Sequence, residues 1–179
     1  MIKIFITNLA KYTRGNLSGE WVTLPINSDK LESIKNRILG NDEELFITDY
    51  TAPFEISEYA NIEELNENMQ ELEELNLDKE EFSALCKCSS SCDYHEILQK
   101  IVDHDYIIIE VTKDIKYMDE SDIARELYDE GFLNHFLKEI PEHLTDLIDW
   151  EQVWTECNVA YGWQSVFFEE SGRQFAVNI

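Results

Sequence analysis

Four residues between positions 86 and 95 carry side chains that bind metals. Cys86, Cys88 and Cys92 precede His95, and a structural zinc site takes four ligands of these types. The spacing differs from the common zinc knuckle, in which two residues separate paired cysteines. On the helix expected over 79–87, Cys86 and Cys88 also point to different faces. We therefore expect reduced thiols and no metal or other cofactor. The alternative hypothesis is a zinc- or thiol-dependent regulatory protein that uses this cluster.

The other residues with catalytic side chains form no recognisable arrangement. The four histidines stand outside nucleophile and metalloprotease motifs, and the six glycines are scattered over expected turns and helix ends. General acid–base catalysis requires a few carboxylates in distinct, partly desolvated surroundings. The many carboxylates of this chain are expected on solvated helix faces. The sequence therefore predicts that the protein is not an enzyme; an acidic enzyme with an unrecognised site is a third hypothesis.

The negative charge is concentrated in two segments of the chain. The 179 residues contain 38 acids and 14 lysines or arginines, for a net charge of -24. Residues 41–81 hold fifteen acids and one base, and residues 119–156 hold twelve acids and two bases. Their net charges of -14 and -10 account for the whole -24. Such a surface repels nucleic acid, and its natural complement is a basic protein surface.

Within the first acidic segment, glutamates recur about once per helical turn. Glu63, Glu67, Glu71 and Glu74 lie three or four residues apart, which on a helix places charges about 4.5–6 Å apart along the axis. An ordinary surface helix mixes signs, because opposite charges at i and i+4 stabilise it. This row resembles instead the charges along a nucleic-acid strand. The expected acidic surface comprises Glu58, Glu63, Glu64, Glu67, Glu71, Glu73, Glu74 and Asp78, together with Asp119, Glu120, Asp122, Glu126, Asp129 and Glu130.

Three groups of elements must position these side chains. Residues 1–60 predict an α+β unit with strands at 3–8, 20–25 and 44–49. Its helix is expected over 29–39, capped by Ser28 and ended by Gly40. Residues 61–103 predict a helical unit. Its first helix begins at Asn61 with a capping-box-like Glu64, and two more are expected at 79–87 and 94–102.

Residues 104–179 predict a second α+β unit. It begins with a strand at 105–111, and Asp119 or Ser121 caps a helix that ends at Gly131. A helix from Pro141 through Ile148 and a short helix at 149–157 follow. Strands at 163–169 and 173–178 form a hairpin. The fold class is therefore α+β. The chain shows neither a signal peptide nor a membrane-spanning run, so we expect a cytoplasmic protein without membrane contact.

Three stretches of the chain resemble the ArdA antirestriction family. The segment KIFITNLAKYTRGNLSGEWVTLPIN (3–27) matches the family opening NLxKYxxGxLxGxW in register, and LFITDYTAPFEISEYANIEELN (45–66) also fits the family pattern. The segment IPEHLTDLIDWEQVW (140–154) resembles the family's antirestriction motif, although residues 154–157 replace the usual Tyr-Gly-Arg-Asp-type continuation. The motif positions are Pro141, Glu142, Leu144, Asp146, Ile148, Asp149, Trp150 and Glu151.

This resemblance implies an elongated protein of three small domains that dimerises through its C-terminal domain. It also implies a surface that imitates bent B-form DNA and blocks the DNA-binding groove of type I restriction–modification enzymes. Family members are carried on mobile genetic elements. The sequence adds one argument for a homodimer, namely that a small C-terminal unit has little interior for its aromatic residues. These residues are Trp150, Trp154, Trp163, Phe167 and Phe168.

Overall fold

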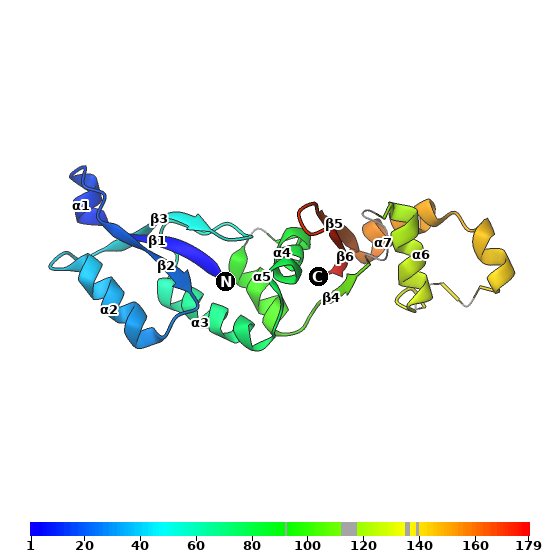
Figure 1. The fold of residues 1–179 in the computed structure, drawn as a ribbon, viewed down its shortest axis with the longest axis horizontal. Helices are drawn as coiled ribbons and strands as arrows, with labels where there is room; N and C mark the ends of the chain where they lie inside the picture. The colour runs from blue at the N-terminus through cyan, green and yellow to red at the C-terminus, as the bar shows by residue number, and fades with distance from the viewer. Residues whose placement is uncertain (92, 112–117, 135–136, 139) are drawn as a thin grey trace. The chain divides into compact units, whose positions relative to one another are not determined.

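The computed structural model in Figure 1 describes residues 1–91, 93–111, 118–134, 137–138 and 140–179. The chain forms two compact units, Met1–Asp105 and Tyr106–Ile179. Each unit has its own three-stranded antiparallel sheet with helices, which confirms the α+β class. The division into domains at 1–60, 61–103 and 104–179 and their elongated arrangement stay predictions.

The first unit is built on a sheet with β1 in the middle. Strand β1 (Ile2–Asn8) pairs antiparallel with β2 (Gly19–Leu24) and with β3 (Leu45–Thr51), in the order β2-β1-β3. Alternate β1 residues are buried, as expected for a strand with one covered face. Helix α2 (Ser28–Leu39) buries three apolar residues at helical spacing. Asn27, not the predicted Ser28, caps α2, because its side-chain oxygen accepts from the amides of residues 29 and 30.

The buried Asn8 side chain joins three parts of this unit. Its oxygen accepts from the Lys11 amide and caps the short helix α1 (Leu9–Thr13), which the sequence analysis did not predict. Its amide nitrogen donates to the carbonyl oxygens of Ile38 and Leu39 at 3.1 and 3.0 Å and to the Asp42 carboxylate at 3.1 Å. The family-like Asn8 therefore fixes the end of α2 against the end of β1.

Three helices complete the first unit: α3 (Ile62–Glu74), α4 (Lys79–Cys88) and α5 (Tyr94–Val102). The predicted cap at Asn61 is confirmed, since its side chain accepts from the amides of Glu63 and Glu64. The full capping box forms at α4, where Asp78 and Glu81 exchange hydrogen bonds with each other's backbone.

In the second unit, β6 (Arg173–Asn178) lies between β4 (Ile107–Glu110) and β5 (Gln164–Phe168). The helices are α6 (Glu120–Asp129), capped by Asp119 as predicted, and α7 (Trp150–Tyr161). The predicted helix at 141–148 is a 3-10 helix, η1 (Glu142–Leu147). Helix α7 runs beyond the predicted end because no helix breaker occurs before Gly162, whose φ of 75° ends it.

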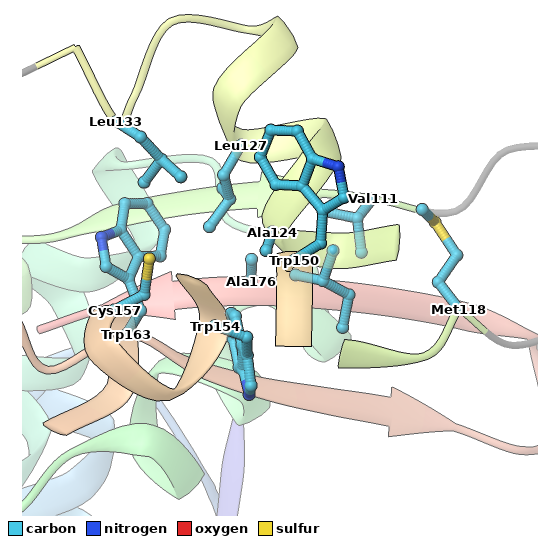
Figure 2. Packing of buried hydrophobic residues seen from close by; sticks show 11 residues of the cluster. Val111, Met118, Ala124, Leu127, Leu133, Trp150, Trp154, Cys157, Trp163 and Ala176 are labelled. Atoms are coloured by element: carbon cyan, nitrogen blue, oxygen red, sulfur yellow. The ribbon is translucent and has the colours of Figure 1, made fainter. Parts of the chain in front are cut away.

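The core of the second unit accommodates its tryptophans. Figure 2 shows Trp150, Trp154 and Trp163 packed with residues of α6 and β6, and only 8, 5 and 2% of their surfaces remain exposed. Phe167 and Phe168 are half-buried. The second unit therefore covers all three tryptophans without a second copy of the chain. The expectation that its interior is too small for them was wrong. The homodimer itself stays a prediction.

Replacement of Gly19, in the family-like opening segment, should destabilise the first unit. A Cβ atom at this position meets the Ile6 carbonyl oxygen too closely and the Phe5 Cε1 atom at 2.8 Å. Overpacking of this kind costs about 1–3 kcal/mol. We expect Gly19→Ala to lower the free energy of unfolding by about that amount in urea titrations. Thr23→Ala, at an exposed site on the same strand, is the control; equal effects of both substitutions would contradict the steric explanation.

Candidate protein-binding acidic surface

Helix α3 turns its glutamates away from the body of the first unit. Its buried residues are Ile62, Leu65, Asn66, Met69 and Leu72. At about 100° per residue, the glutamate row defined above (Glu63, Glu67, Glu71 and Glu74) falls within about 80° of arc on the opposite side. All four glutamates are exposed. The row expected from the sequence therefore exists as a continuous strip of carboxylates on the outer face of α3.

Two α3 glutamates have basic neighbours, and the other four form no ion pair with a described residue. Glu63 forms an ion pair with Lys35 of α2, and Glu64 lies 3.3 Å from the Nδ1 atom of His95. The other four are exposed and make no ion pair with any residue in the described part of the chain. They are Glu67, Glu71, Glu73 and Glu74. The uncompensated charge of α3 therefore lies towards its C-terminal two-thirds. Glu58, in the loop before α3, is also exposed.

Two acids of the predicted surface have a structural role. Asp78 caps α4 and Asp119 caps α6, and each side chain accepts hydrogen bonds from helix amides. The positive end of a helix stabilises such a carboxylate. Both are exposed and still contribute charge, but their substitution affects the fold as well.

The remaining acids of the second segment lie on and after α6. Glu120, Asp122, Asp129 and Glu130 are exposed, whereas Glu126 is half-buried. Arg125 on the same helix reaches Asp146 of η1 at 3.4 Å, a long and exposed ion pair that contributes little to stability. The structure thus divides the predicted surface between α3 in the first unit and α6 in the second.

The antirestriction-like motif contains three residues with structural contacts and a second set that is exposed. The Trp150 indole donates to the Thr145 carbonyl oxygen at 3.1 Å, Asp149 caps α7, and Ile148 packs on the core of the second unit. These three residues hold η1 in place. The exposed set comprises Pro141, Glu142, Leu144, Asp146 and Glu151.

Leu147, the last residue of η1, was not among the predicted motif residues, and its side chain is 78% exposed. A single exposed leucine is ordinary by itself. Its position in η1 adds a second exposed leucine, next to Leu144, to a set that also contains three acids. The signal that could have found it is the 3-10 spacing, which puts residue 147 on the same side as Leu144.

The cysteine cluster does not form a metal site in the part of the chain that the structure describes. Cys86 and Cys88 are buried, and His95 is half-exposed, beside Tyr94 and Glu64. Cys92 lies outside the described residues. Across the described residues, no group of three or more histidines, cysteines or acids could hold a metal ion. The zinc alternative has no support here.

The described helices also include none that is both long and apolar enough to cross a membrane.

Three buried thiols, Cys86, Cys88 and Cys157, should react slowly in the folded protein. Burial raises the pKa of Cys86 from its ordinary value of 9.0 to about 12, and those of Cys88 and Cys157 to about 11. Only the thiolate reacts, so alkylation should be roughly a hundredfold slower than in urea at pH 8. The thiols of the unfolded chain lose protons from about pH 9 and those of the folded chain only near pH 11–12, so raising the pH across this window favours unfolding.

Site-resolved mass spectrometry of iodoacetamide adducts measures these rates. Rapid labelling of Cys86 in the folded protein near neutral pH would contradict its burial.

The resemblance of the opening segment to a known family agrees with the comparison of this chain with protein families. A search of curated proteins found no match. The family described as antirestriction protein (ArdA) matches residues 4–167, which include both acidic segments and the motif around Trp150. The match spans most of the 179 residues, and the chain therefore belongs to the ArdA family of antirestriction proteins.

Proposed function

We propose that this protein inhibits type I restriction–modification enzymes by occupying their DNA-binding groove with a surface that imitates DNA. The observation that carries the proposal is the glutamate row of α3. It is exposed, lies opposite the buried face and is largely free of ion pairs with described residues. ArdA proteins are inhibitors and not enzymes, and their antirestriction activity requires contact with a restriction–modification enzyme.

The physical basis of this mimicry is the similarity between a carboxylate row and a phosphate backbone. Duplex DNA carries one negative charge per about 1.7 Å of axis, so a net charge of -24 equals that of about 40 Å of duplex. A groove that binds DNA is rich in lysine and arginine, and it attracts any surface with a similar field. The glutamates stand in for phosphates, while the caps Asp78 and Asp119 also hold their helices.

The second unit contributes further carboxylates to the proposed enzyme-binding surface. The exposed acids of α6 and the exposed motif residues Glu142, Asp146 and Glu151 present carboxylates from consecutive elements. A cytoplasmic homodimer through this unit doubles the length of the mimic, because a two-fold axis repeats every charge. The exposed acids then lie at the rim of the dimer interface, where water screens their repulsion.

Binding should compete with DNA and weaken with salt. We expect the protein to displace duplex DNA from a type I methyltransferase core, with an affinity that falls as ionic strength rises. The salt dependence should be shallower than that of DNA, because a folded protein carries no comparable layer of condensed counterions. Fluorescence anisotropy of labelled DNA, titrated at several salt concentrations, measures both effects. Equal affinity at low and high salt excludes mimicry.

The unpaired glutamates should matter more than paired acids of equal charge. We expect the triple variant Glu67→Gln, Glu71→Gln, Glu74→Gln to weaken inhibition roughly tenfold, because exposed charges contribute about 0.2–1 kcal/mol each. Reversal of Glu67 alone should have a small effect.

The matched control neutralises three acids that already pair with a base: Glu20 with Arg37, Glu32 with Lys35 and Glu110 with Arg173. Both triple variants change the net charge equally. If they weaken inhibition equally, net charge alone explains binding, and the glutamate row has no special role.

A further inference from the structure

A second feature of the first unit is a cavity of about 510 Å³ between the end of β3 and the start of α5. It lies entirely within Met1–Asp105. We call it the tyrosine pocket. Its lining includes Tyr50, Glu55, Tyr59, Asp93, Tyr94 and His95.

Ring contacts hold the aromatic walls of the tyrosine pocket in place. Tyr59 stacks on Phe46 with centroids 6.3 Å apart, and Tyr94 stacks on Phe54 at 5.8 Å. Tyr59 is nevertheless 70% exposed and Tyr50 36% exposed. An exposed aromatic ring that is fixed from behind can contact a ligand without losing much side-chain freedom.

Two carboxylates, Glu55 and Asp93, lie in the lining of the tyrosine pocket, and its one described basic side chain, His95, lies beside Glu64. Glu55 is exposed and has no ion pair with a described residue, and Asp93 uses one oxygen to accept from the His95 amide. Neither lysine nor arginine occurs among the described residues that line the cavity. A cationic side chain of a binding partner would therefore contact two carboxylates and the exposed rings of Tyr50 and Tyr59.

The Tyr94 hydroxyl is an independent sign of a missing ligand. Tyr94 is 93% buried, since only 7% of its surface is exposed, and its hydroxyl oxygen has no hydrogen-bond partner among the described residues. A buried polar atom without a partner costs about 1–3 kcal/mol, so such atoms are rare in folded proteins. Because less than 1 Å² of this oxygen is accessible, a donor in the pocket reaches it only when neighbouring side chains move aside.

We propose that the tyrosine pocket receives an arginine side chain of the restriction–modification enzyme; this inference rests on the function proposed above. Arginine fits better than lysine, because its planar guanidinium stacks on aromatic faces and carries five donors. Those donors match the exposed Glu55 carboxylate. DNA-binding grooves contain arginines that contact phosphates and base edges, so such a side chain is available in the proposed partner.

Binding in the pocket should respond to salt differently from binding to the glutamate row. A cation held between rings is partly desolvated and is screened less than an exposed charge. We therefore expect Tyr59→Ala to weaken binding to a type I methyltransferase core about 3- to 30-fold, with a similar factor at low and high salt. The loss caused by the triple glutamine variant should shrink as salt rises.

The chain offers a matched control for this substitution. Tyr12 is also exposed and also contacts the Phe46 ring, at 5.2 Å, but it does not line the pocket. Tyr12→Ala should leave binding unchanged within about twofold. Equal losses from Tyr59→Ala and Tyr12→Ala overturn the proposal, because they indicate a general effect on the packing of Phe46.

A direct titration separates this proposal from the proposed function. The full-length protein is titrated with N-acetylarginine methylamide, and tyrosine ring signals are followed by NMR, with the lysine and norleucine amides as comparisons. Saturable shifts at Tyr50 and Tyr59 that are largest with arginine, and absent in Tyr59→Ala, support the pocket even if the protein fails to inhibit the enzyme. Identical, non-saturating shifts with all three amides overturn it even if inhibition occurs.

Discussion

The hydrogen bonds between the Asn66 side chain and the backbone of Ile26 determine which way α3 faces. The Ile26 amide donates to the Asn66 oxygen at 2.8 Å, and the Asn66 amide donates to the Ile26 carbonyl at 2.9 Å. Asn66 is fully buried, and Gln70 one turn later donates to the same carbonyl. Burying Asn66 is favourable only with these partners, so α3 cannot rotate without losing them. The outward direction of the glutamate row on α3 follows from this contact.

The acidic composition opposes folding, and apolar packing must compensate for it. Each unit has a core of fully buried aliphatic and aromatic side chains, with Leu65 and Leu85 in the first and Leu127 and Phe175 in the second. The repulsion among the carboxylates acts through water and is screened, whereas burial of apolar surface is not. This difference allows a chain with a net charge of -24 to keep two ordered units.

Sequence patterns predicted the elements well where periodicity was strong. The glutamates that recur once per helical turn indicated the outer face of α3, and Asn61 marked its start. The predicted helix type was wrong at 141–148, where contacts with residues outside the segment determine the backbone conformation. The indole of Trp150 bonds the Thr145 carbonyl, so the segment after Pro141 winds as a 3-10 helix, and no local rule shows that contact. The tyrosine pocket could not be predicted either, because it joins residues about 40 positions apart in the chain.

The N-caps of the described α-helices change character along the chain. Asn8, Asn27 and Asn61 cap α1, α2 and α3, whereas Asp78, Asp93, Asp119 and Asp149 cap α4 to α7. Asparagine and aspartate cap helices about equally well, so at exposed caps such as Asn27 and Asn61 one can replace the other with little effect on the fold. Asn8 is an exception, because its buried amide nitrogen donates to two carbonyl oxygens and to the Asp42 carboxylate. Each exchange at an exposed cap nevertheless changes the net charge by one. These positions thus give an evolving lineage a series of nearly neutral steps along which the strength of its electrostatic field can drift towards a new target.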